Sequence, residues 1–539
     1  MNGSPFGGGS VGDFVVIDCD THAVFARVME VRLPMTERHD LDPSMGQILS
    51  PHPMAKLHLL GALDLAKNSV VGGISKHPVL GAQVYGASAE TVGRFAKAMA
   101  SQGKLPGDQV SLAIGHVKDA SSTPVRLSIK GLFSRHCAIL GATGGGKSTT
   151  IATILHSCRE QLPRCKILLI DATGEFAGAA NGQTSCFLGS GNAPEGEKRV
   201  RIPSDNLRES DYFAILNPSP TQRIKLSEAI RSLRLVKLLE DETYATEKEA
   251  LKDYLSPRGT VKKRDLERLN FFKIISNKTF AQNLESPDSK FDFTKLADQV
   301  LHECVKEAGE KWVEDQNSQG WCQPLVSKIR IFNHSDSWKP IFGDPTPPSL
   351  FQEIQTFLAS EEQMLRINLS QLSFDVGLRE IAVNLIGRWL GDFIRDFNLT
   401  KKAPVVVFLD EAHNFLNQHL GDDDLRYKLD AFEKLAKEGR KYWLSLVLST
   451  QQPRDIPAGI LSQMGTLIVH RLINEADRRV VEMACGQIDA AAARFVPNLA
   501  PGEAAIIGID FPIPLTIQVD LPPDHAKPSS ASPDYGKWI

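Results

Sequence analysis

The first part of the chain alternates apolar and polar positions. Residues 11–34 follow this period of two, and short apolar runs recur at 57–64 and 69–74 with Gly and Pro between them. Alternation of this kind is typical of strands that bury one face. The pattern predicts a small antiparallel β-unit, a barrel, over about 11–125. A helix-compatible segment at 86–100 is expected to be appended to it.

From about residue 126 the pattern changes to apolar runs without alternation, each followed by a helix-compatible segment. The runs are 136–140, 166–171, 404–409, 444–449 and 466–470. Strands that are apolar on both faces belong to parallel sheets covered by helices on both sides. The second part of the chain is therefore predicted to be an α/β domain.

A long charged region, 205–345, separates the second of these runs from the third. Helical spacing at 225–240 and 293–315 makes a helical insertion the simplest interpretation. The segment 261–273 is basic and aromatic, but acidic residues interleave it, which favours a solvated helix face over a nucleic-acid surface. The tail from about 522 is rich in Pro and Ser and is predicted to be extended.

These changes of pattern divide the chain into five parts. They are an N-terminal β-barrel (1–125), the first part of the α/β core (126–204), the helical insertion (205–345), the second part of the core (346–521) and the extended tail (522–539).

Composition limits the classes of function. The chain has 539 residues, a net charge of −3, and 42% hydrophobic and 23% charged residues. This argues against a protein that simply coats DNA, although a ring could confine its basic residues to a channel. No apolar run reaches the ~20 residues that cross a bilayer, and the eight cysteines form no CxxC pair. We expect no membrane association, reduced thiols and a cytoplasmic location.

Residues 141–148 read GATGGGKS and fit the phosphate-loop pattern GxxxxGK[ST] between a predicted strand and a predicted helix. The glycines allow backbone N–H groups to surround phosphate oxygens at a helix N-terminus. Lys147 is expected to reach the β- and γ-phosphates, and the Ser148 hydroxyl to bind Mg²⁺. The predicted contacts of bound ATP or GTP are Gly141, Ala142, Thr143, Gly144, Gly145, Gly146, Lys147, Ser148 and Thr149.

Two further strand ends carry candidate catalytic residues. Asp410 and Glu411 follow the run at 404–409; Asp410 is predicted to hold Mg²⁺ with Ser148, and Glu411 to polarise the attacking water. Gln451 follows the run at 444–449 and is predicted to sense the γ-phosphate. Asp171 and Glu175 lie at the end of the run at 166–171. Two interpretations remain for them: they order water or Mg²⁺ or contact the next subunit, or they are structural caps.

Several segments together resemble the HerA branch of the HerA–FtsK motor ATPases over about 126–520. They are HCAILGATGGGKST (136–149), LLIDATGEF (168–176), INLSQL (367–372), VVVFLDEAHNF (405–415), KLAKEGRKYWLSLVLSTQQP (434–453), LIVHRLINEADRR (467–479) and LAPGEAAIIGIDFPIPLTI (499–517). The resemblance implies a RecA-like P-loop core, an N-terminal HAS-barrel-like domain, and a homo-hexamer with ATP and Mg²⁺ between subunits and double-stranded DNA in its pore. One departure is Gly145, where such loops often carry serine.

The resemblance also implies an arginine supplied by the neighbouring subunit to stabilise charge on the transferred phosphoryl group. Arg440 is the first candidate, because it follows a predicted amphipathic helix that ends near 438. Arg471, just after the run at 466–470, is the second, and Arg135, just before the phosphate loop, is the third.

The predicted function is an ATP-hydrolysing DNA translocase or helicase that acts with a partner in DNA end processing or anti-phage defence. The sequence contains no nuclease constellation, so cutting would belong to a partner nuclease, a sirtuin-like protein or another effector. The alternative is an ATP-regulated hexameric scaffold that assembles and activates an effector without processive movement on DNA. A conjugation or secretion ATPase shares the motor core, but the lack of a membrane segment weighs against it.

Overall fold

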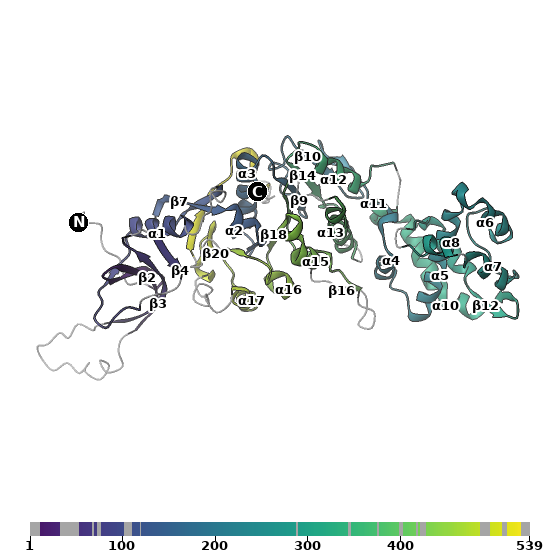
Figure 1. Ribbon diagram of the computed structural model, residues 1–539, viewed down its shortest axis with the longest axis horizontal. Helices are drawn as coiled ribbons and strands as arrows, with labels where there is room; N and C mark the ends of the chain where they lie inside the picture. The colour runs from purple at the N-terminus through teal and green to yellow at the C-terminus, as the bar shows by residue number, and fades with distance from the viewer. Residues whose placement is uncertain are drawn as a thin grey trace, which may run out of the picture.

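The computed structural model describes the following residues: 11–32, 53–66, 69–72, 77–101, 110–118, 120–276, 278–286, 289–342, 346–373, 377–397, 403–416, 419–420, 427–485, 496–508 and 515–529. Figure 1 shows a large central sheet with its helices, a smaller N-terminal sheet on one side and a helical lobe on the other.

All five apolar runs of the predicted core form strands of the large sheet. They are β8 (Cys137–Leu140), β9 (Lys166–Asp171), β15 (Val405–Leu409), β18 (Leu444–Thr450) and β19 (Thr466–Val469). Their order in the sheet is β9, β15, β18, β8 and β19, and every neighbouring pair is parallel.

Successive residues of each central strand enter two different apolar clusters. Ala138 and Leu140 of β8 belong to the cluster that includes α13 (Leu378–Phe397), whereas Cys137 and Ile139 belong to the cluster that includes α3 (Lys147–Gln161). The sheet is therefore covered on both faces, which is why its strands lack polar alternation. This confirms the predicted α/β core.

Seven more strands widen the sheet on both sides. Parallel strands β14 (Met364–Asn368), β10 (Thr184–Phe187) and β11 (Lys198–Arg199) extend it beyond β9. Antiparallel strands β20 (Glu503–Gly508), β21 (Leu515–Val519), β6 (Ser111–Val117) and β7 (Ala120–Ser128) extend it beyond β19. The sheet is thus mixed, with the antiparallel strands at one edge.

The predicted boundary at residue 125 assigns β6 and most of β7 to the N-terminal unit, whereas in the structure both are strands of the large sheet. β6 pairs with β21 of the large sheet, and its Leu112 and Ile114 are fully buried in the same cluster as α3. β6 and β7 lie at the antiparallel edge of the large sheet. Alternation alone did not distinguish this edge from a separate β-unit.

The N-terminal unit is an antiparallel sheet in the order β4, β3, β2, β1, β5. Its strands are β1 (Phe14–Cys19), β2 (His22–Arg32), β3 (Met54–Asp64), β4 (Ser69–Gly72) and β5 (Val84–Gly86). Within the described ranges β4 and β5 lie at opposite edges without pairing, so closure into a barrel stays a prediction. The predicted appended helix is confirmed as α1 (Ala89–Ser101), whose Phe95 ring stacks on Phe25 with centroids 3.9 Å apart.

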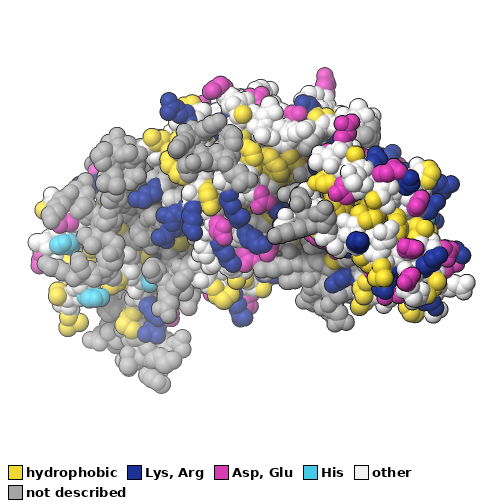
Figure 2. Space-filling view, turned by 45° about the vertical axis from the view of Figure 1, so that its right-hand side comes forward, with side chains coloured by type: hydrophobic (Ala, Val, Ile, Leu, Met, Phe, Trp, Pro, Cys, Tyr) yellow, Lys and Arg dark blue, Asp and Glu magenta, His cyan; other side chains and the backbone are white. Residues whose placement is uncertain are grey.

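Between β11 and β14 the chain is mainly helical and forms the lobe at the right of Figure 1. Its helices are α4 (Glu209–Leu216), α5 (Pro220–Leu238), α6 (Ala245–Ala250), α7 (Arg268–Ile275), α8 (Lys278–Leu284), α9 (Leu296–His302) and α10 (Gln316–His334). Two further helices, α11 (Lys339–Phe342) and α12 (Leu350–Ala359), lead back to the core. Hydrophobic and charged side chains are interspersed on the face of this lobe in Figure 2.

Part of the predicted helix at 293–315 is wrong. After α9 the chain forms a hairpin of β12 (Val305–Ala308) and β13 (Lys311–Glu314). Gly309 adopts a φ of 62° in the turn, a conformation that glycine allows at little cost and that ends a helix. The hairpin places Trp312 against Phe271 of α7, with ring centroids 5.4 Å apart.

The last described residues lie against the chain's own core. The backbone N–H of Ser529 donates to the carbonyl of Glu175 at 2.9 Å, and residues 530–539 of the predicted tail lie outside the described residues. Among the helices in the described ranges, none has the length and apolar content needed to cross a bilayer.

Candidate active site

The carboxyl ends of the parallel strands bring the predicted site residues together. The phosphate loop follows β8, Gln451 follows the adjacent β18, and Asp410 follows β15, which pairs with β18. Parallel strands end at the same edge of a sheet, which is the usual position of ligand sites in α/β proteins. The structure therefore clusters residues that are 300 positions apart in sequence.

The phosphate loop turns sharply between β8 and α3. Gly144 and Gly146 have φ values of 73° and 113°, which other residues rarely adopt. The N–H of Gly145 donates to the carbonyl of Ala142 at 3.1 Å, and the N–H of Gly141 donates to the carbonyl of Thr450 at 3.2 Å. Because α3 begins at Lys147, its first-turn N–H groups have no intrahelical acceptor and can bind an anion.

Lys147 is buried, and its Nζ donates to the carbonyl of Ala142 at 3.2 Å. Burial lowers the pKa of Lys147, while the carboxylates of Glu411 and Asp410 oppose that shift. The Lys147 ammonium is thus bonded to its own loop and lies near enough to Glu411 and Asp410 to be influenced by their charges.

Asp410 is buried beside other carboxylates. Burial, followed by the charges of Glu411 and Asp171, raises the pKa of Asp410 to about 8. The Thr173 hydroxyl donates to Asp410 Oδ2 at 3.4 Å. The shift indicates that this corner of the site has more negative charge than the chain itself neutralises.

Glu411 has an unusual backbone conformation and one unused oxygen. Its φ of 46° lies in the left-handed region, which costs a non-glycine residue energy and is common at functional sites. Its Oε1 accepts a hydrogen bond from Gln451 Nε2. Its buried Oε2 has no hydrogen-bond partner among the described residues, although His413 Nδ1 lies 3.3 Å away.

A hydrogen-bonded bridge joins the acid pair to the phosphate loop. The Thr143 hydroxyl donates to Gln451 Oε1, and Gln451 Nε2 in turn donates to Glu411. The amide of Gln451 is therefore placed between the loop and the second acid. The sequence suggested Gln451 as a sensor but gave no sign of its contact with Thr143.

The donor set fits Mg²⁺ bound with a nucleotide. Mg²⁺ prefers oxygen ligands and is usually held by one or two carboxylates together with phosphates and water. Ser148 in the first turn of α3 and the charge-crowded Asp410 carboxylate supply such oxygens. Within the described ranges no three His, Cys, Asp or Glu side chains form a metal site by themselves.

Asp171 is a structural cap. Its Oδ1 accepts the N–H of Gly174 at 2.8 Å, and its Oδ2 accepts the N–H of Phe176 at 3.1 Å and Nε of Arg366 at 2.7 Å. These contacts support the capping alternative for Asp171. Arg366 was not predicted from the sequence, because nothing in β14 indicates which acidic residue this arginine contacts.

Known proteins of one family are similar to this chain. The model of the family "Helicase HerA, central domain" matches residues 112–376. The probable DNA double-strand break repair helicase HerA of Methanocaldococcus jannaschii is 26% identical over 436 residues, covering 76% of each chain. The DNA double-strand break repair helicase HerA of Sulfurisphaera tokodaii is 25% identical over 485 residues, covering 88% of this chain and 79% of that protein. These matches support a HerA-type ATPase.

Among solved structures, the chain is similar to VirB4 of Thermoanaerobacter pseudethanolicus, with a TM-score of 0.48, 15% identity, and coverage of 79% of this chain and 100% of that one. It is also similar to the plasmid coupling protein TrwB in complex with ADP and Mg²⁺, with a TM-score of 0.47, 13% identity, and coverage of 82% and 96%.

The three candidate arginines lie at two edges of the sheet. Arg440 and Arg135 are exposed and precede β18 and β8, so they lie at the amino edge. The seven residues of β18 span about 23 Å, which separates Arg440 from its own phosphate loop. Arg471 is exposed at the carboxyl edge, and its carbonyl accepts the N–H of Ala142 at 2.8 Å.

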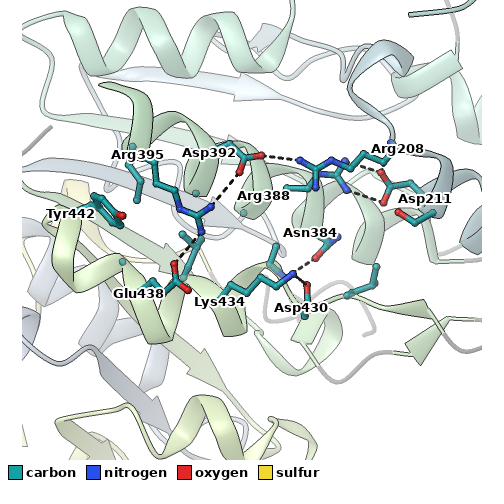
Figure 3. A pocket seen from close by; sticks show the side chains of 18 of the residues that line it. Arg208, Asp211, Asn384, Arg388, Asp392, Arg395, Asp430, Lys434, Glu438 and Tyr442 are labelled. Carbon is teal, nitrogen blue, oxygen red and sulfur yellow. Dashed lines mark hydrogen bonds and ion pairs between the residues drawn. The ribbon is translucent and has the colours of Figure 1, made fainter. Parts of the chain in front are cut away.

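A cavity of about 270 Å³ lies away from the phosphate loop, between α4, α13 and α15 (Ala431–Glu438). Figure 3 shows that its charged side chains face one another as ion pairs. Arg388 contacts Asp211 at 2.7 Å, and Arg208 contacts Asp392 at 3.1 Å. These pairs join the helical insertion to α13, so the cavity lies between two parts of the chain and apart from the phosphate loop.

Proposed function

We propose that this HerA-type ATPase is an ATP-driven, hexameric double-stranded DNA translocase or helicase that works with a partner nuclease or another effector. The observation that carries the proposal is the unpartnered Glu411 Oε2 beside the phosphate loop. A carboxylate oxygen buried without a donor is costly, and it is suited to accept a proton from an attacking water.

In this proposal the chain's own groups divide the work of hydrolysis. The N–H groups of the phosphate loop and the Lys147 ammonium bind the β- and γ-phosphates of ATP. Ser148 and Asp410 would hold Mg²⁺, which neutralises phosphate charge when bound. Glu411 accepts the proton of the attacking water, and Gln451 orients Glu411 through the hydrogen bond between them.

The proposed DNA substrate rests on the relatives. The proteins from Methanocaldococcus jannaschii and Sulfurisphaera tokodaii carry the name DNA double-strand break repair helicase. The hexamer is supported by the position of Arg440, which is too far from its own phosphate loop to reach it and could reach the loop of a neighbour. A ring also reconciles DNA binding with the net charge of −3, because basic residues need only line its pore.

A scaffold that activates an effector without moving along DNA is the alternative. The cavity of paired charges shows how the insertion is attached to the core, and such an attachment could transmit a nucleotide-dependent change to a bound protein. The two functions differ in one measurable respect: a motor hydrolyses ATP faster on duplex DNA and displaces obstacles, whereas a scaffold responds to its protein partner alone.

The test compares ATP hydrolysis with and without duplex DNA, together with displacement of streptavidin from a biotinylated duplex. Both activities are expected in the wild type and are expected to be lost in Lys147→Ala. Lys252→Ala is a matched control, since Lys252 is an exposed lysine of the insertion paired with Glu249. ATP hydrolysis indifferent to DNA, with no displacement, would exclude the motor and leave the scaffold.

A further inference from the structure

We propose that His470 is a positioning residue that holds the phosphate loop from behind, acting through Thr150 and through direct packing on the loop glycines. The inference rests on the proposed role of this loop in binding nucleotide and adds a residue to it. His470 does not itself reach the face that receives phosphate, because it lies between the loop and the turn before β20.

His470 immediately follows β19, the strand beside β8, and is fully buried. Its Nε2 lies 2.8 Å from the hydroxyl of Thr150, on the first turn of α3. Its Nδ1 lies 2.8 Å from the carbonyl of Glu503 at the start of β20. The imidazole thus spans from the helix that begins the phosphate site to the antiparallel edge of the sheet.

The two hydrogen bonds fix the protonation of the ring. A carbonyl only accepts, so Nδ1 carries the hydrogen that is donated to Glu503. Burial, opposed by this backbone hydrogen bond and aided by the charge of Lys147, lowers the pKa of His470 to about 4. The ring is therefore neutral at neutral pH. The Thr150 hydroxyl lies within hydrogen-bond distance of two acceptors, His470 Nε2 at 2.8 Å and the carbonyl of Gly146 in the phosphate loop at 3.1 Å.

Three loop glycines pack closely on His470, Gly141 and Gly145 on its Cβ and Gly146 on its ring. A Cβ added to Gly141 would lie 2.5 Å from His470 Cβ, and one added to Gly146 would lie 3.2 Å from His470 Cε1. At Gly145 an added Cβ would lie 3.3 Å from His470 Cβ and 3.1 Å from the carbonyl of Ala142. Glycine at 145, the departure from the family pattern, therefore suits close packing on this histidine.

The turn before β20 completes the support. The N–H of Gly502 donates to the carbonyl of Gly145 at 3.1 Å, one residue before Glu503 accepts from His470. Loop, histidine and turn are held as one packed unit. Loss of the imidazole would remove two hydrogen bonds and leave a cavity directly behind the loop, so the loop would no longer be preorganised for phosphate.

The expected signature is weaker nucleotide binding with little change in the chemical step. In His470→Ala we expect the Kd for a fluorescent ATP analogue, and the KM for ATP, to rise about tenfold or more, with kcat within about threefold of wild type. Thr150→Val removes the hydroxyl at nearly constant shape and should weaken binding by a smaller factor. Combining the two substitutions should weaken binding no more than His470→Ala alone, because they remove one shared interaction.

Thr153→Val is the matched control. Thr153 lies one turn further along α3 and donates to the carbonyl of Asp520 at 2.7 Å, so the substitution removes a comparable buried hydroxyl away from His470. Its nucleotide affinity should equal that of the wild type. If His470→Ala does not fold, as judged by its thermal unfolding, His470→Gln and Thr150→Val carry the same comparison.

An unchanged Kd in His470→Ala or His470→Gln would overturn the inference, as would effects of the Thr150 and His470 substitutions that simply add. The readout is nucleotide affinity and needs no DNA. If the wild type binds nucleotide normally but neither responds to DNA nor displaces an obstacle, the proposed motor function fails while the role of His470 stands.

Discussion

Gln451 donates a hydrogen bond from its side-chain amide to Glu411, and the second carboxylate oxygen of Glu411 is buried without a hydrogen-bond partner among the described residues, 3.3 Å from His413 Nδ1. The two side chains come from the ends of adjacent parallel strands, β15 and β18. If Glu411 is the general base, one oxygen is fixed by the amide and the other is free for water. The role of each can be separated by mutation.

Replacing Glu411 by Gln should abolish turnover while nucleotide binding is kept. The substitution preserves shape but removes the proton acceptor, so we expect kcat to fall by about 10²-fold or more. The Kd for a fluorescent ATP analogue should change little. Glu249→Gln, at an exposed carboxylate of the insertion, is the control and should match the wild type. Wild-type hydrolysis in Glu411→Gln would remove this residue from the mechanism.

Replacing Gln451 by Ala should have a smaller effect on the same step. Glu411 would keep its charge but lose the hydrogen bond that orients it, so kcat should fall by about 10- to 100-fold with little change in KM. Steady-state ATP hydrolysis measures both quantities. A rise in KM with kcat preserved would instead mean that Gln451 acts in binding and not in orienting Glu411.

The sequence predicted the parts of this protein whose signals are local. The phosphate loop, Asp410 and Gln451 each follow an uninterrupted apolar strand, and parallel pairing of those strands brings them to one edge. Contacts between distant segments had no local signal. His470 reads as the end of an apolar run, and only the pairing of β19 with β8 places it behind the loop.

The assignment of β6 failed for a related reason. The strand that it pairs with in the core, β21, lies some 400 residues away in sequence, and no pattern within residues 111–117 indicates that partner. The hairpin at 305–314 was missed because apolar spacing over so few residues fits a strand as well as a helix. Gly309 was the residue in this segment that could have indicated a turn between two strands.

The buried pair of Arg366 and Asp171 should be important for stability. Both side chains are almost fully buried, and Arg366 also contacts Glu197 at 2.6 Å. Arg366→Met would leave two buried carboxylates without their cation, and we expect a loss of about 3–5 kcal/mol. Thermal unfolding in the absence of nucleotide measures it. Arg330→Met, at an exposed pair with Asp298, is the control and should change stability by less than about 1 kcal/mol. Equal melting temperatures for the two variants would contradict the prediction.

The neutral imidazole of His470 should make stability depend on pH. The pKa of His470 is about 4 in the folded chain and 6.5 in the reference state. As pH falls through 6.5, the unfolded chain binds a proton that the folded chain does not, so stability is lost between about pH 6.5 and 4 and is fully present above that window. Protonation of this residue should lower the free energy of unfolding by about 3 kcal/mol across that window.

Other groups titrate in the same window, so the test compares two proteins. Thermal unfolding of the wild type and of His470→Gln is followed from pH 7.5 to 4.5. The wild type should lose stability more steeply, because the glutamine does not titrate. Parallel curves for the two proteins would show that His470 is not held neutral.

Arg440 should act on the site of a neighbouring subunit. It lies at the amino edge of the sheet, about the length of β18 from its own phosphate loop, and it is exposed. Arg440→Ala should therefore lower kcat strongly, because charge on the transferred phosphoryl group loses its external cation. Mixing this variant with Glu411→Gln in one ring distinguishes action on a neighbour from action within the same chain.

In such a mixed ring, a site is complete when its own Glu411 is intact and the neighbour supplies an intact Arg440. Random equal mixing gives this combination in about a quarter of sites, so co-expressed subunits carrying two different tags should recover about a quarter of wild-type ATP hydrolysis. Within a single chain the two defects never complement, and the mixture would stay inactive. The same mixing with Arg135→Ala and Arg471→Ala ranks the three candidates, because recovery is expected only for the arginine that crosses the subunit boundary.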